Sequence, residues 1–157
     1  MSYTILIVDD EPDIHAATKL SLKNMQFSGQ ELKMVFVDSG AAALKHMAQH
    51  PETAVILMDV VMENEHAGLT AIQEIRGELG NEMVRILLRT GQPGVAPEKQ
   101  VIDDYDIDGY LAKSEMTQTR LYSSVRAALK SFSELQEIQR NRDALVYLNQ
   151  SLITMHE

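Results

Sequence analysis

The sequence predicts an α/β fold in which a doubly wound, five-stranded parallel sheet is covered by helices on both faces. Short apolar runs rich in β-branched residues alternate with segments whose apolar residues recur at helical spacing. Several of these runs end abruptly at acidic residues, which is typical of a buried strand running into a loop. Strands that alternate with helices on this scale favour a parallel sheet with right-handed crossovers.

Each expected strand is a short apolar segment bounded by polar or glycine-containing stretches. A strand buried on both faces of a parallel sheet is expected to be apolar almost throughout, as these segments are. The expected strands are Ile5–Val8, Lys33–Val37, Ala54–Met58, Val84–Leu88 and Gly109–Ala112.

The segments between the strands carry helix signals. Pro12 suits the first turn of a helix, whose apolar spacing continues to about Phe27. Ser39 is a plausible cap for the next helix, which Pro51 closes. Further helices are expected over about 69–79, over about 97–104 and from 117 to the end.

Composition limits the function classes. The chain has 157 residues, of which 45% are hydrophobic, so one core with an appendage is expected. Fourteen Lys and Arg against 23 Asp and Glu leave a formal net charge of −9, and without a basic run nucleic acid is not expected as a direct partner. No apolar run approaches the ~20 residues that span a bilayer, and no secretory signal opens the chain, so a cytoplasmic protein is predicted.

Polar residues gather at the ends of the expected strands. Asp9, Asp10, Asp59, Thr90 and Lys113 all follow or end apolar runs. The carboxyl ends of parallel strands form the edge at which ligands collect. Three carboxylates at one site repel each other unless a cation compensates them, and oxygen-only ligands favour Mg²⁺.

This set of residues also fits phosphoryl transfer to an aspartate. An Asp can attack phosphorus and form an acyl phosphate if the charge of the transferred group is neutralised from several sides. Lys113 offers a positive charge and Thr90 a hydroxyl hydrogen bond, in addition to Mg²⁺.

Four segments together resemble the receiver domain of bacterial two-component response regulators, and the resemblance covers roughly residues 3 to 130. They are Ile-Leu-Ile-Val-Asp9-Asp10-Glu11-Pro, Ile-Leu-Met-Asp59-Val-Val-Met62, Leu-Arg-Thr90-Gly91 and Tyr110-Leu-Ala-Lys113. The resemblance implies a flavodoxin-like receiver fold and phosphorylation at Asp59. The family pattern departs at Glu63 and Ser114, positions where prolines are usual.

The resemblance also implies roles for the remaining residues. Asp10 and Asp59 are implied as direct Mg²⁺ ligands, Asp9 as a nearby or water-mediated ligand, and Val61 as a ligand through its backbone carbonyl. Thr90 and Tyr110 are implied as the switch, which moves inward on phosphorylation. A narrower resemblance, over Arg89–Gly94 and Tyr105–Thr117, is to receivers that precede HD-type or cyclic-di-GMP output modules.

The C-terminal segment lacks Pro and Gly and carries two apolar series. The first series, through Leu121, Val125 and Phe132, is out of register with the second, through Leu145, Leu148 and Leu152. We interpret residues 1–130 as the receiver and residues 131–157 as a helical linker or coiled coil that forms a homodimer and leads to an output domain outside this chain. The alternative is a hairpin that folds back near residues 140–143.

The predicted function is therefore that of a regulatory receiver rather than an enzyme. Asp59 would accept a phosphoryl group from a sensor histidine kinase or a phosphotransfer protein. One alternative is a Mg²⁺-dependent phosphohydrolase with an Asp nucleophile, although Val61 stands where that class needs a second acid. The other is a degenerate receiver that signals without phosphorylation.

Overall fold

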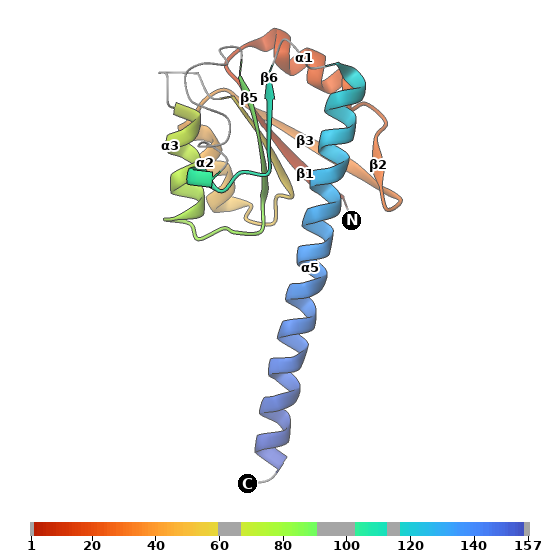
Figure 1. Ribbon diagram of the computed structural model, residues 1–157, viewed down its shortest axis with the longest axis vertical. Coiled ribbons are helices and arrows are strands. Elements are labelled where there is room, and N and C mark those ends of the chain that lie inside the picture. Colours follow the sequence, from red (N-terminus) through yellow and green to blue (C-terminus); the bar gives the residue numbers. More distant parts are fainter. Residues whose placement is uncertain (1, 60–66, 91–102, 113–116, 156–157) are drawn as a thin grey trace.

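A computed structural model describes residues 2–59, 67–90, 103–112 and 117–155, which form a sheet between helices and one long projecting helix (Figure 1). The strands are β1 (Tyr3–Val8), β2 (Gln26–Phe27), β3 (Gln30–Val37), β4 (Val55–Asp59), β5 (Arg85–Thr90) and β6 (Gly109–Ala112). The helices are α1 (Pro12–Ser21), α2 (Gly40–Gln49), α3 (Ala67–Arg76) and α5 (Gln118–Met155).

The sheet has the strand order β2-β3-β1-β4-β5-β6. All pairings from β3 to β6 are parallel, whereas the short β2 pairs antiparallel with β3 at the edge. The predicted doubly wound α/β fold is confirmed. The sheet has six strands in the described part of the chain, one more than the five that the apolar runs predicted.

The first helix is shorter than the sequence predicts. It was expected to reach about Phe27, but α1 ends at Ser21, and β2 forms where its last turn was expected. Leu22 and Met25 continue the apolar spacing because they pack into the core from the loop, with 1% and 5% of their surface exposed. Burial, rather than helix formation, explains the pattern beyond α1.

The ends of α3, β4 and β5 also differ from the prediction. Helix α3 ends at Arg76 instead of near Leu79, whose side chain is 38% exposed. Strand β4 includes Asp59 as its last residue, and β5 extends to Thr90. The short helix expected over about 97–104 lies largely outside the described residues.

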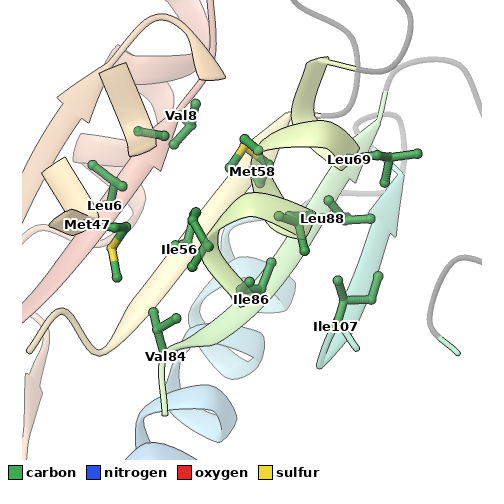
Figure 2. Close-up of a cluster of buried hydrophobic side chains, with 14 residues drawn as sticks. Leu6, Val8, Met47, Ile56, Met58, Leu69, Val84, Ile86, Leu88 and Ile107 are labelled. Carbon is green, nitrogen blue, oxygen red and sulfur yellow. The ribbon is translucent and has the colours of Figure 1, made fainter. Parts of the chain in front are cut away.

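Alternating side chains of the central strands build two cores on opposite faces of the sheet. Figure 2 shows the core under α2 and α3, in which Leu6, Ile56 and Ile86 come from three neighbouring strands. The residues between them in sequence, such as Ile7 and Leu57, face the other way and pack against α5. Because both faces are covered, β4 is buried throughout and β1 is buried from Ile5 to Val8.

Helix α5 has two parts with different surroundings. Leu121, Val125 and Phe132 are buried against the sheet. Beyond them the helix leaves the domain (Figure 1), and every residue from 137 to 150 is exposed. The helix is continuous over residues 118–155, so it does not fold back near residues 140–143.

Candidate functional site

The ends of two adjacent strands place three aspartates together. Asp9 follows β1 directly and Asp59 ends β4, and these strands pair in register up to Val8 and Met58. The carboxylate oxygens of Asp9, Asp10 and Asp59 lie within 4.8 Å of one another. Among the described residues no other group of acidic or histidine side chains meets in this way.

The three aspartates differ in exposure. Asp9 and Asp59 are buried, with 0% and 1% of their surface exposed, whereas Asp10 is exposed. The Asp9 amide donates a hydrogen bond to the Val37 carbonyl at 3.1 Å, and its Oδ1 accepts one from the Glu11 amide at 2.9 Å. Backbone contacts on both sides of Asp9 therefore hold its carboxylate at the strand end.

This donor set suits a hard divalent cation. Two buried carboxylates beside a third acid repel one another, and a cation relieves that repulsion. Oxygen donors with one exposed member match Mg²⁺, which keeps several of its own waters in protein sites. The chemistry of the donors thus fits the predicted metal, and Asp9, Asp10 and Asp59 are the described side chains that would hold it.

An open cleft of about 480 Å³ borders Asp9 and Asp10 on the side of α1 and α2. It is lined by Asp9, Asp10, His15, Phe36 and Asp38, among others. The His15 and Phe36 rings pack at 5.2 Å between centroids and form one wall. The acidic site is therefore open to solvent on the side of Asp9 and Asp10.

Sequence reasoning missed a fully buried arginine at this site. Arg89 lies opposite Asp59 in the β4–β5 register, and 1% of its surface is exposed. Its Nη1 donates a hydrogen bond to Thr18 Oγ1 at 2.7 Å. Burial lowers the pKa of the Arg89 guanidinium, and the carboxylates of Asp9 and Asp59 oppose this shift. The available signal was a charged residue directly after an apolar run and before Thr90.

Of the other predicted site residues, Thr90 and Tyr110 lie in the described part of the chain, and Val61 and Lys113 lie outside it. Thr90 ends β5, where it pairs with Ala112 of β6, but its side chain is not described. Tyr110 is half-buried on β6 and packs against the core under α2 and α3. Lys113 and Val61 lie outside the described residues, so their predicted roles stay predictions.

Comparison with known proteins identifies the family. The sequence model of the response regulator receiver domain matches residues 5–126. The chain belongs to this family. Receiver domains bind Mg²⁺ at an acidic cluster, and Asp9, Asp10 and Asp59 form such a cluster here. They take phosphoryl groups from histidine kinases, which places this receiver in two-component signalling.

One curated relative is the 3'3'-cGAMP-specific phosphodiesterase 2 of Vibrio cholerae serotype O1 (strain ATCC 39315 / El Tor Inaba N16961). It is 43% identical over 133 residues, which are 85% of this chain and 26% of the relative. The receiver thus spans about a quarter of the relative's length.

Solved structures confirm the receiver fold. The signal receiver domain of an HD domain-containing protein from Pseudomonas fluorescens Pf-5 has a TM-score of 0.72 and 21% identity, covering 87% of this chain and 93% of that chain. An adenylate cyclase structure from Rhodopirellula baltica has a TM-score of 0.75 and 20% identity, covering 91% of this chain and 98% of that chain.

Among the helices in the described residues, none combines the length and the apolar character needed to cross a membrane.

Proposed function

We propose that Asp59 is the phosphoryl acceptor of this receiver and that the donor is a phosphohistidine of a sensor kinase or phosphotransfer protein. The observation that carries the proposal is the meeting of Asp59 with Asp9 and Asp10 at the end of two paired strands. Asp59 is buried, with 1% of its surface exposed, and lies beside the two other acids, which suits a nucleophile held in one orientation.

The proposed reaction uses the phosphohistidine donor, the carboxylate of Asp59 and a Mg²⁺ ion at the acidic site. A carboxylate oxygen of Asp59 attacks phosphorus, the phosphorus–nitrogen bond of the phosphohistidine breaks, and the imidazole nitrogen keeps the bonding electron pair. Asp10, Asp59 and the backbone carbonyl of Val61 would hold Mg²⁺, with Asp9 near it or bound through water, and the ion would supply positive charge for the phosphoryl oxygens. We assign Lys113 and the Thr90 hydroxyl to the same oxygens, and Thr90 with Tyr110 to the conformational response.

The signal is proposed to leave the receiver through α5. This helix packs on the same face of the sheet as Asp9 and Asp59, and it then continues beyond the domain. The exposed apolar residues Ile138, Leu145, Leu148 and Leu152 recur at heptad spacing, which supports a homodimeric coiled coil. The relative with 43% identity supports a cyclic-dinucleotide phosphodiesterase as the class of output that such a helix would control.

Phosphoryl acceptance can be tested with a small-molecule donor. Incubation with Mg²⁺ and acetyl phosphate should add the mass of one phosphoryl group to the chain, and Asp59→Asn should abolish the adduct. Asp38→Asn is a matched control, because Asp38 is an exposed acid of the same cleft and is not one of the three clustered aspartates. Intact-protein mass spectrometry reads both outcomes.

Two results would reject the proposal in favour of its alternatives. Absence of an Asp59-dependent adduct in the presence of Mg²⁺ would indicate a receiver that signals without phosphorylation. Release of many phosphates per chain, measured as inorganic phosphate over time, would indicate a phosphohydrolase.

A further inference from the structure

Strand β5 carries a buried arginine directly beside the phosphoacceptor strand. Leu87 and Arg89 share the face of the sheet that α5 covers, whereas Ile86 and Leu88 point into the opposite core. A guanidinium in this position is costly to bury, because it loses its hydration. Its location therefore needs a compensating interaction.

One compensation comes from α1. The Arg89 guanidinium donates to Thr18 Oγ1 at 2.7 Å, and the Thr18 hydroxyl donates to the Ile14 carbonyl at 2.8 Å. Thr18 is itself buried, with 1% of its surface exposed. A small cavity of about 100 Å³ beside this contact is lined by Thr18, Arg89 and Leu121, so the guanidinium lies where α1, α5 and the sheet meet.

The second compensation comes from the acidic site. Asp59 is the register partner of Arg89 across β4 and β5, and neighbouring strands are only ~4.8 Å apart. Asp9 follows β1, the next strand along. Both carboxylates interact electrostatically with the guanidinium, and all three side chains are at most 1% exposed. Charges this well shielded from water interact strongly.

We propose that Arg89 is a positioning residue and a fixed internal counter-charge of the phosphoacceptor site, which weakens cation binding and strengthens binding of the phosphoryl group. This inference rests on the proposed function of Asp59. A permanent positive charge lowers the attraction of the acids for Mg²⁺ and raises their attraction for an anion. The charge of Arg89 thus lowers the affinity of the site for Mg²⁺ and raises its affinity for the phosphoryl group.

Opposite changes in two affinities distinguish this role from a structural one. In Arg89→Met the dissociation constant of Mg²⁺ should fall about threefold or more, while that of beryllofluoride, an anionic phosphoryl mimic, should rise about threefold or more at saturating Mg²⁺. Calorimetric titration measures both constants. Arg89→Lys keeps the charge, so both constants should stay within about twofold of wild type.

Thr18→Val is the control for packing and hydrogen bonding. It removes the hydroxyl partner of Arg89 and leaves the guanidinium charge in place. It should therefore lower the unfolding temperature without changing the dissociation constants of Mg²⁺ and beryllofluoride in opposite directions. Weakening of both affinities together in Arg89→Met would show that Arg89 only supports the fold and would overturn the proposal. Unchanged affinities in that variant would overturn it as well.

A measurement on the unaltered chain keeps the proposal testable if Arg89→Met fails to fold. The guanidinium Nε resonance of Arg89 should shift when Mg²⁺ and then beryllofluoride are added. Arg76 is the matched reference, because its guanidinium is also largely buried but bonds the carbonyls of Val84 and Asp106 at the other end of the strands. An Arg89 resonance as unresponsive as that of Arg76 would overturn the proposal.

The outcomes separate this inference from the function on which it rests. Failure of the wild-type chain to bind Mg²⁺ and beryllofluoride would overturn the assignment of Asp59 and, with it, the role of Arg89. If the wild type binds both ligands but Arg89→Met does not change their dissociation constants in opposite directions, only the proposed role of Arg89 would be overturned.

Discussion

At the scale of single residues, aspartates of this chain have distinct tasks that depend on the end of the sheet at which they lie. Asp9 and Asp59 are buried at the carboxyl ends of β1 and β4, beside the guanidinium of Arg89. Asp108 lies at the opposite end, just before β6, where it bonds Arg85 and the backbone amide of Ile86. Position relative to the strands, rather than residue type, separates the aspartates of the proposed phosphoacceptor site from one that holds two segments together.

Asp108 joins β5 to the segment before β6 and should be important for stability. Its Oδ1 accepts a hydrogen bond from Arg85 Nη1 at 2.8 Å, and its Oδ2 accepts one from the Ile86 amide at 2.8 Å. Burial lowers the pKa of the neighbouring Arg76 guanidinium, and Asp108 is the strongest opposing charge. We expect Asp108→Ala to reduce the free energy of unfolding by about 2–3 kcal/mol in urea titrations.

Asp106→Asn provides the comparison for Asp108. Asp106 also pairs with Arg76, at 3.8 Å, but its side chain is 82% exposed. Exposed ion pairs contribute little, and asparagine tolerates the positive φ of 51° at this position. The change should stay within about 0.5 kcal/mol. Equal losses in the free energy of unfolding of the two variants would contradict the claim that the carboxylate bonds of Asp108 stabilise the protein.

At the scale of elements, strand β2 of the β2–β3 hairpin occupies a segment that was predicted as the end of the first helix. Ser28 and Gly29 connect the strands with φ angles of 52° and 74°. Both values lie in the left-handed region that the favoured two-residue hairpin turns require. The apolar spacing of the preceding helix continued to about Phe27, so the sequence pattern indicated an α1 that included the residues of β2.

Gly29→Ala should destabilise the protein by about 1 kcal/mol, measured by thermal unfolding. A Cβ at this position meets no heavy atom within 4 Å, so the cost arises from the backbone conformation alone. Ser28→Asn is the paired change, and it should be neutral or stabilising because asparagine adopts positive φ more readily. Stability losses in both variants would contradict a turn-based origin.

At the scale of the whole molecule, α5 is both part of the core and an exposed extension. Its first part packs on the face of the sheet that contains Arg89, and its second part has apolar side chains in water. Leu148 and Leu152 are 56% and 54% exposed in the single chain. Exposure of this kind along one seam is typical of a helix that pairs with a second copy.

We expect the double change Leu148→Glu and Leu152→Glu to convert a dimer into a monomer in sedimentation experiments. The unfolding of the receiver monomer should not change, because neither residue contacts its core. Val146→Glu with Ile153→Glu is the control, since these residues are 51% and 62% exposed but lie off the heptad seam. A dimer that survives the first pair, or that is lost equally with the second, would contradict pairing along this seam.

The local sequence was sufficient to predict most of the fold. Apolar runs that end at Asp9 and Asp59, separated by helical spacing, indicated the parallel sheet and the edge at which the acids meet. Ser39 was correctly predicted as a helix cap, since its hydroxyl accepts from the Ala42 amide at 3.1 Å. These features depend on residues near one another in the chain, so their periodicity is visible in the sequence.

Only the tertiary structure determined the surroundings of these elements. Thr18 and Arg89 are 71 positions apart, and nothing local indicates that they bond across the core. Leu22 is buried outside a helix because distant segments of the chain pack around it. Helix α5 continues past Leu135 as one helix, where the hairpin alternative would have needed the chain to fold back on itself. The sequence by itself thus determined which residues form the acidic site, whereas long-range packing placed a buried arginine beside it.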